Sequence, residues 1–344
     1  MILVGRIALI PELEIPHWAD RHNYYWHSNR GPDDGVATTD LAKVFFDKCY
    51  VRPLVSSAWN IVNNEGHTEA QKSDAWETIK KLDQKHNYSD NAVMLGGRLA
   101  QTAVDAVLIE NRPLNLAIEE SLKATESYKV RNWDDGSDAK NLALVKDDLE
   151  GVIKNSIEGI KEALFGKNQI IGEIELMGRL NGNLLPYNTR PDYDKCGDLK
   201  TKWSKTKKQH LLKDGKTMSV DRTPPSLPKD LSSGWNLRNV YQAAGFYALN
   251  GKKPPFLLYA SKSDYRLFTP ENCEQLQPDF LESIILRISQ RNQSTEACLR
   301  MAQNQKELLG LQYPTFSNFF WKSAPPAYIE EAEKVWGDAL NHAC

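Results

Sequence analysis

Hydrophobic residues recur along this chain with two different periods, which predict helices on both sides of a short β-rich region. Between residues 139 and 165, apolar side chains return every three or four positions, as at Leu142, Val145 and Leu149, and Gly166 follows as a helix end. The same spacing predicts further helices over 39–48, 71–82, 93–109, 235–249, 278–291, 295–309 and 325–340.

The period changes after Gly166, and the chain there favours strands. Residues 170–185 are expected to form a β-hairpin around the turn Asn181-Gly182. Strands are also predicted over 196–201 and over 255–260, the latter pairing with 265–268. The polar, Lys-rich stretch 201–230 is predicted to be a long loop. This order predicts an α/β fold in which helices flank a mixed central sheet.

The composition is that of an ordinary globular protein, with 344 residues, 41% hydrophobic and 26% charged. The five cysteines are widely spaced without a CxxC pair, which disfavours a zinc ribbon or a disulfide scaffold and favours reduced thiols. No apolar run approaches the roughly 20 residues that span a bilayer, and the start lacks the features of a signal peptide. We therefore expect a cytoplasmic protein without a membrane partner.

The chemistry is concentrated where Pro191-Asp192 is followed, after five residues, by Asp198-Leu199-Lys200. Because alternate residues of a strand share a face, Asp198 and Lys200 should project together while Leu199 enters the core, leaving its carbonyl within reach of an ion. Two converging carboxylates suit Mg²⁺ or Mn²⁺. The neighbouring lysine would orient the attacking water or, as the neutral amine, deprotonate it.

Two acidic or polar sites precede this motif. Gln101 lies on the predicted buried helix, four residues after Gly97 and four residues before Asp105. Glu173 and Glu175 share one strand face by the period of two, so their spacing does not choose between them. Glu175 is preferred because it is nearer the hairpin turn.

A third site follows the motif. Gln242 and Phe246 are one helical turn apart, with Tyr247 as the alternative aromatic residue, and an apolar strand comes next. In this order, the four motifs resemble those of the PD-(D/E)XK nuclease superfamily, in particular its RecB-like exonuclease branch, over about residues 95–262. The relatives resembled are phage exonucleases and the mitochondrial genome maintenance exonuclease.

The resemblance implies a restriction-endonuclease-like PD-(D/E)XK core over residues 91–270. An N-terminal helical, aromatic-rich region (1–90) and a C-terminal helical region (271–344) would pack as additions to it. The implied activity is that of a Mg²⁺- or Mn²⁺-dependent DNA exonuclease, which hydrolyses phosphodiester bonds from DNA ends, in the host cytoplasm if the protein is viral. A structure- or site-specific endonuclease on the same core and a catalytically silent DNA-binding or recombination protein remain as alternatives.

The resemblance also implies roles for single residues. One or two metal ions would be held by Asp192, Asp198, Glu175, Gln101 and the carbonyl of Leu199. Gln101 stands where the family has histidine, and an amide is a weaker ligand. Lys200 would position the attacking water, and Gln242 would support Lys200.

The charge distribution suggests the partner. The whole chain has a net charge of −2, but residues 200–229 hold nine basic and two acidic residues. Directly after the motif, such a segment could follow a DNA backbone or be an ordinary solvated loop. The expected DNA contacts are Lys202, Trp203, Lys205, Lys207, Lys208, Arg222 and Tyr247, with Trp203 and Trp235 stacking on bases. Beyond single-stranded or duplex DNA ends, a single-strand annealing or binding protein is the suggested partner.

Overall fold

The computed structural model describes residues 27–28, 41–82, 91–129, 137–205, 210–211, 217–218, 223–312, 314, 316, 321, 324 and 326–340. The chain divides into two compact units. Unit 1 comprises Met1–Asn87, Met177–Thr189 and Ile285–Cys344, and unit 2 comprises Tyr88–Leu176 and Arg190–Ile284. Residues 177–189, which the sequence places in a central region, therefore belong to unit 1 together with both ends of the chain.

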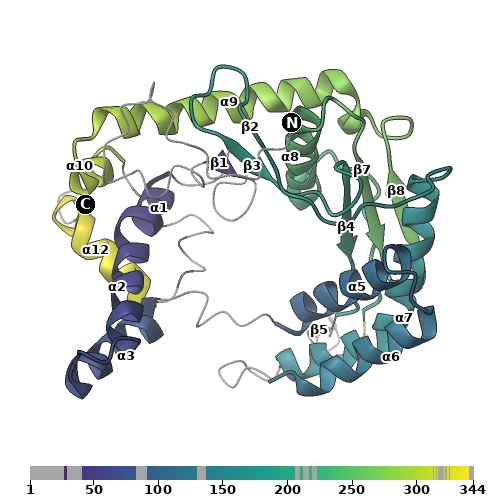
Figure 1. Cartoon of the computed structure of the whole chain (residues 1–344), viewed down its shortest axis with the longest axis horizontal. Coiled ribbons are helices and arrows are strands. Elements are labelled where there is room, and N and C mark those ends of the chain that lie inside the picture. The colour runs from purple at the N-terminus through teal and green to yellow at the C-terminus, as the bar shows by residue number, and fades with distance from the viewer. Residues whose placement is uncertain are drawn as a thin grey trace. The chain divides into compact units, whose positions relative to one another are not determined.

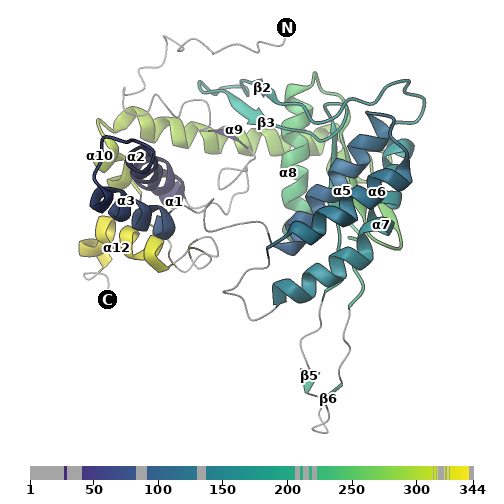
Figure 2. The same ribbon diagram turned by 60° about the horizontal axis from the view of Figure 1, so that its bottom comes forward.

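Unit 2 is a mixed α/β unit built on the three-stranded sheet β4-β7-β8. Helices α5, α6 and α7 lie beside these strands (Figure 1). Its elements are α5 (Ala92–Leu108), α6 (Leu114–Ala124), α7 (Ser137–Ala163), β4 (Gly197–Thr201), β5 (His210–Leu211), β6 (Thr217–Met218), α8 (Gly234–Leu249), β7 (Phe256–Ala260), β8 (Tyr265–Phe268) and the first part of α9 (Pro278–Met301). The short strands β5 and β6 pair antiparallel as a separate sheet (Figure 2).

The sheet of unit 2 has β7 in its centre and β4 at an edge. Strand β4 runs parallel to β7, with Leu199 opposite Leu258, and β8 runs antiparallel to β7. Every residue of β7 is buried, as expected for a strand covered on both faces. Neighbouring residues of β7 face different helices. Leu258 lies close to Gly159 of α7, whereas the Tyr259 hydroxyl lies 2.6 Å from Asn239 Nδ2 of α8.

The core of unit 2 lies between this sheet and the long helix α7. Buried positions recur along α7 at the predicted helical spacing, including Val145, Leu149, Ile153 and Ile160. Helix α5 packs on α7 and on β4, and its start is capped by Asn91, whose side chain accepts a 2.8 Å hydrogen bond from the Met94 backbone. Two helices and an edge strand thus meet around one apolar core.

Unit 1 has a separate core of aromatic residues. Phe46 is fully buried and contacts Tyr50, Trp321, Tyr328 and Trp336. The elements of unit 1 are β1 (His27–Ser28), α1 (Leu41–Phe46), a π-helical turn (Asp47–Val51), α2 (Arg52–Val62), α3 (Glu69–Leu82), β3 (Tyr187–Thr189), the second part of α9, α10 (Gln305–Gly310) and α12 (Pro326–Leu340). Strand β2 (Leu176–Gly178) begins at the last residue of unit 2 and joins the sheet β1-β3-β2.

Much of the predicted secondary structure is confirmed. Helices α5, α7 and α8 and the β7–β8 pair begin and end within two residues of their predicted limits. The limits of the predicted hairpin were wrong: residues 170–175 form no strand before β2, and the second strand, β3, begins at Tyr187, after the predicted end at 185. Its turn does form at Gly182, whose positive φ of 78° favours glycine.

Other elements differ from the prediction. Residues 278–301 form the single helix α9 rather than two helices, since no glycine or proline interrupts them and the polar residues Asn292 and Glu296 are buried. Helix α6 was not predicted at all. The expected helix start at Thr39-Asp40 lies outside the described residues. Of the five cysteines read as reduced thiols, Cys49, Cys196, Cys273 and Cys298 are free and buried, and Cys344 lies outside the described residues.

The helices of the described residues do not have the features of membrane spans. None of them combines the length and the apolar character that a membrane crossing requires.

The contact between α7 and the loop after β7 gives a stability test. A Cβ atom at Gly151 would lie 2.4 Å from the backbone oxygen of Lys262, which cannot rotate away. We expect Gly151→Ala to lower the free energy of unfolding by roughly 1–3 kcal/mol, the usual cost of overpacking. Urea denaturation measures this change.

The matched control is Gly337→Ala in α12, where an added Cβ meets nothing within 4 Å. There the substitution should raise stability by about 0.5–1 kcal/mol, because alanine favours a helix more than glycine does. Equal stability of Gly151→Ala and the wild type would contradict the described packing of α7.

Candidate active site

A tight turn returns the chain from Asp192 to strand β4. The Asp192 backbone N–H donates to the Gly197 oxygen at 2.8 Å, and the Gly197 N–H donates to the Tyr193 oxygen at 2.7 Å. Asp194 and Lys195 have positive φ angles of 54° and 66°, the left-handed conformation that closes this turn. The five residues between the two aspartates therefore bring both to the outer edge of β4.

The Asp192 carboxyl group is held by two donors. Its Oδ2 accepts a 2.8 Å hydrogen bond from the Leu199 backbone, and its Oδ1 accepts a 3.2 Å bond from Gln101 Nε2 of α5. Since the N–H and C=O of one strand residue point to the same side, the Leu199 carbonyl also faces this edge. Burial of the carboxyl, and next the charge of Asp198, raise the pKa of Asp192 to about 8.

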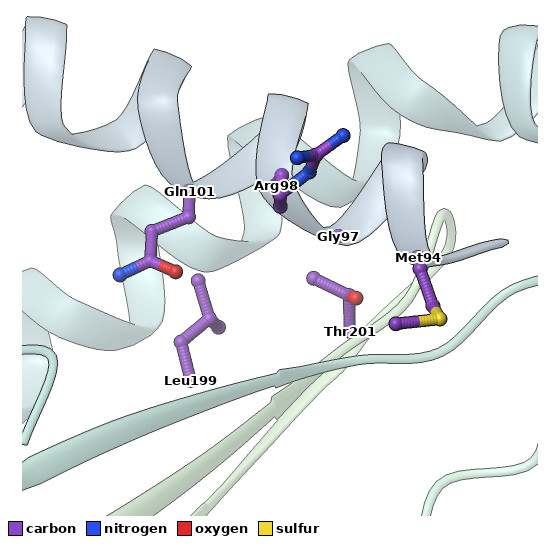
Figure 3. A pocket seen from close by; sticks show the side chains of 6 residues that line it. All are labelled: Met94, Gly97, Arg98, Gln101, Leu199 and Thr201. Atoms are coloured by element: carbon purple, nitrogen blue, oxygen red, sulfur yellow. The ribbon is translucent and has the colours of Figure 1, made fainter. Parts of the chain in front are cut away.

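Asp198 and Lys200 leave β4 on the face that α8 covers. Lys200 Nζ lies 2.6 Å from Asp198 Oδ2 and donates a 2.9 Å hydrogen bond to Gln242 Oε1. The Asp198 side chain is almost fully buried, whereas that of Lys200 is 27% exposed. Lys200 is thus held between a carboxylate and an amide while it remains accessible to solvent. Figure 3 shows Leu199 and Thr201 pointing toward α5.

A second acidic group lies behind Asp192. The Tyr193 hydroxyl donates a 2.8 Å hydrogen bond to Asp105 Oδ1 of α5. Burial, and to a smaller extent the charge of Glu173, raise the pKa of Asp105 to about 6, against the lowering effect of this bond. Glu173 is itself paired with Arg190 at 2.7 Å.

Glu173, rather than the preferred Glu175, is the glutamate whose charge raises the pKa values of the nearby aspartates. Its charge acts on both Asp192 and Asp105. Glu175 is exposed and acts on Glu173. The expectation for Glu175 assumed a strand over 172–176, but this segment is irregular, and its Ile174 N–H donates to the Pro191 oxygen instead.

The donors at the edge of β4 suit a hard cation better than a metal that needs a closed protein cage. Among the described residues, no group of three or more His, Cys, Asp or Glu side chains could hold a metal. A closed zinc-type cage is therefore absent from that part of the chain. Mg²⁺ is commonly bound by one or two carboxylates, with water and substrate oxygens completing its shell. Asp192, Asp198 and the Leu199 carbonyl fit this pattern, and a cation would relieve the repulsion that raises the pKa of Asp192.

Two aromatic residues predicted to contact DNA are buried. Trp203 is 4% exposed, donates to Thr201 Oγ1 at 3.0 Å and lies beneath Gly96 of α5. Tyr247 is 5% exposed within α8. Neither ring can stack on a base without leaving the core, so these two assignments are corrected. The lysines on either side of Trp203 favour a surface position for it, but packing against α5 buries its ring.

The predicted basic contacts are only partly described. Lys202 has its Nζ 5.2 Å from the centre of the Tyr259 ring, and burial lowers its pKa. Lys205 is exposed, and its backbone pairs with Thr223. Lys207, Lys208 and Arg222 lie outside the described residues, as does the side chain of Trp235.

Sequence reasoning missed the residues that support the motif. Tyr193 follows Asp192 and Arg190 precedes it by two positions, but only the fold shows that they reach Asp105 and Glu173. Their position within the motif was the one available signal. No protein-family model, curated protein or solved structure matches the chain. We therefore infer the chemistry of the site from its own geometry.

The raised pKa of Asp192 predicts how stability depends on pH. Without added metal, the folded chain retains a proton on Asp192 between about pH 4 and pH 8, whereas an unfolded aspartate with a pKa near 3.9 has lost it. Stability should therefore fall as pH rises through this range. Asp192→Asn removes this dependence and should be more stable than the wild type at pH 8. The difference is on the order of a few kcal/mol.

Urea titrations from pH 5 to pH 9 in EDTA measure the effect. Asp264→Asn, at an exposed position of unit 2, serves as the control and should follow the wild-type profile. Parallel pH profiles for Asp192→Asn and the wild type would show that Asp192 is charged throughout.

Proposed function

We propose that this protein is a Mg²⁺-dependent DNA exonuclease with a PD-(D/E)XK-type active site of the RecB-like kind. The observation that carries the proposal is the meeting of Asp192, Asp198 and Lys200 at one edge of β4. Lys200 is held by Asp198 and by Gln242 from a separate helix. A structural ion pair alone would not need a second buried carboxylate beside it, because like charges there cost stability.

Asp192, Asp198 and the Leu199 carbonyl would hold the metal, and Gln101 would orient Asp192 through its amide. When bound, Mg²⁺ neutralises charge on the phosphodiester and on the departing oxygen. Because Asp192 Oδ1 and Oδ2 each accept one hydrogen bond from the described residues, each oxygen has a further lone pair for a cation.

Lys200 would position the water that attacks phosphorus. An ammonium has three N–H donors, and two of its directions are taken by Asp198 and Gln242. The third can reach a water or a phosphate oxygen from the partly exposed side. Gln242 thus acts through Lys200 as a positioning residue.

DNA is the proposed substrate because of the charge that follows the site. The nine basic residues in 200–229 begin with Lys200 itself, and β5 and β6 form a small antiparallel pair within this segment. The phosphate backbone of a DNA strand could bind along these basic residues as it leads away from the metal site. Cleavage from ends, rather than internally, rests on the resemblance of the motifs to exonucleases.

The proposal predicts release of nucleotides from end-labelled linear DNA with Mg²⁺, and none from circular DNA. Asp198→Asn should reduce the rate at least about 10³-fold, because one of the two carboxylate ligands becomes a weak amide ligand. Lys200→Met should cause a loss of about 10²–10⁴-fold, the usual contribution of a positioned acid or base. Gel analysis of single-stranded, duplex and circular substrates measures both.

The matched control is Lys262→Met, a lysine after β7 that pairs with Asp147 in the first half of α7; it should retain the wild-type rate. Cleavage of circular DNA, which has no ends, would show that the protein is an endonuclease and not an exonuclease. DNA binding without any cleavage would favour a silent DNA-binding protein. A Lys200→Met protein with the wild-type rate would remove the assigned role of this lysine.

Salt dependence tests the basic segment. In an Asp198→Asn background, changing Lys205, Lys207 and Lys208 to glutamine should weaken DNA binding without regard to sequence. The slope of log K against log salt should become shallower by up to roughly 2, since each phosphate contact with a single strand contributes about 0.7. Fluorescence anisotropy at roughly 50–300 mM salt measures the affinity, and a plot of these values gives the slope.

The control for the salt test is a second triple change, Lys123, Lys154 and Lys161 to glutamine. These lysines are exposed on α6 and α7 of unit 2. If both triple variants reduce the slope equally, binding depends on total charge and not on the segment after β4.

A further inference from the structure

Lys202 continues the row of side chains that Asp198 and Lys200 begin on β4. It directly follows the last residue of the strand, and its backbone N–H still donates to the Ala260 oxygen of β7 at 2.7 Å. Because alternate residues of a strand share a face, Lys202 lies on the face that α8 covers, about 6–7 Å along the chain from Lys200. The proposed active site therefore has a second lysine beside it.

The ammonium of Lys202 is placed by an aromatic ring and not by a carboxylate. Its Nζ lies 5.2 Å from the centre of the Tyr259 ring, within the distance of a cation–π contact. Tyr259 is fully buried, and Asn239 Nδ2 of α8 donates a 2.6 Å hydrogen bond to its hydroxyl oxygen, which fixes the ring. In the part of the chain that the structure describes, no carboxylate pairs with Lys202.

The surroundings of this ammonium favour an anionic ligand. Lys202 is half-buried, and burial, followed by the charges of Lys205 and Lys200, lowers its pKa. A half-buried cation next to like charges costs stability, and this cost falls when an anion binds beside it. Lys200, in contrast, already has the Asp198 carboxylate at 2.6 Å. Of these two lysines, Lys202 is therefore the one that lacks a counter-charge.

A second phosphate group of the substrate would supply this counter-charge. Lys200 lies beside Asp198 and would meet the phosphate whose bond is cut. The step from Lys200 to Lys202 is similar to the distance between neighbouring phosphate groups of an extended nucleic-acid strand. Both lysines are also accessible, since the Lys200 side chain is 27% exposed and Lys202 is half-buried. One strand could therefore place successive phosphates at the two lysines.

We propose that the Lys202 ammonium, held against the Tyr259 ring, binds the phosphate group next to the one that is cut and so fixes the position of the DNA strand on β4. This inference rests on the proposed nuclease function, to which it adds a substrate contact one nucleotide from the metal site. Lys202 is one of several DNA contacts expected from the sequence, but its half-buried position and its aromatic contact distinguish it from the exposed Lys205.

Removing the charge of single phosphates tests this contact. In one linear oligonucleotide, the phosphate inward of the first cleaved bond is an uncharged methylphosphonate; in a second, the terminal phosphate is absent. Each is made for both ends of the strand, and an unmodified strand is the reference. Initial rates on gels give kcat/KM. With the wild type, one of the two changes should lower kcat/KM at least about tenfold, the worth of one charge-assisted hydrogen bond.

Three variants assign the effect to a residue. Lys202→Met keeps the apolar contact with Tyr259 and removes an ammonium that no carboxylate balances, so the chain should fold, as urea denaturation can check. This variant should cleave the unmodified strand about tenfold more slowly and no longer respond to the loss of the phosphate charge. Lys202→Arg keeps a cation and should respond like the wild type. The control Lys262→Met, which changes a lysine paired with Asp147, should also respond like the wild type.

The outcomes separate this contact from the nuclease proposal. A response that is lost only in Lys202→Met supports the contact. A wild type that cleaves DNA but responds to neither change, or a Lys202→Met protein that responds like the wild type, overturns the contact and leaves the nuclease standing. If no DNA is cleaved, the nuclease proposal fails, and fluorescence anisotropy with the unmodified strand decides on the lysine. Binding that Lys202→Met weakens about tenfold more than Lys262→Met retains a phosphate contact, and equal binding overturns it.

Discussion

Two aspartate side chains meet at the outer edge of β4, and neighbouring residues offset part of the electrostatic cost of placing both carboxyl groups there. Burial and mutual repulsion disfavour the charged form of Asp192 and raise its pKa to about 8. The Leu199 backbone N–H and the Lys200 ammonium act in the opposite direction. The balance leaves a site whose electrostatic cost falls when a cation binds. A purely structural cluster would more simply contain one carboxylate and its lysine.

The alternation of side chains along β4 allows one edge strand to serve two faces. Asp198 and Lys200 face α8, where Gln242 holds the ammonium. Leu199 and Thr201 face α5, where they line a pocket with Arg98 and Gln101 (Figure 3). Because β4 is paired on one side only, its outer backbone groups remain available, and Asp192 uses one of them. A central strand could not offer this edge.

The part of the site that the sequence predicted is the part set by local geometry. The period of two placed Asp198 and Lys200 together, and the structure has them 2.6 Å apart. The helical period placed Gln242 on a helix, but its contact with Lys200 depends on how α8 packs on the sheet. The preference for Glu175 over Glu173 rested on a strand, and a period of two does not apply to this segment, which forms none.

The sequence by itself determined the helices with strong periodicity, the paired strands β7 and β8, and the spacing of the Asp192 and Asp198 motif. These features depend on residues close in the chain, whose geometry is set by backbone sterics and burial of one face. Only the tertiary structure decided that Trp203 and Tyr247 are core residues, that Asp105 accepts a hydrogen bond from Tyr193, and that Gln101 of α5 reaches Asp192. Such contacts join residues far apart in sequence, so they follow from the packing of α5 and α8 on the sheet and not from any local pattern.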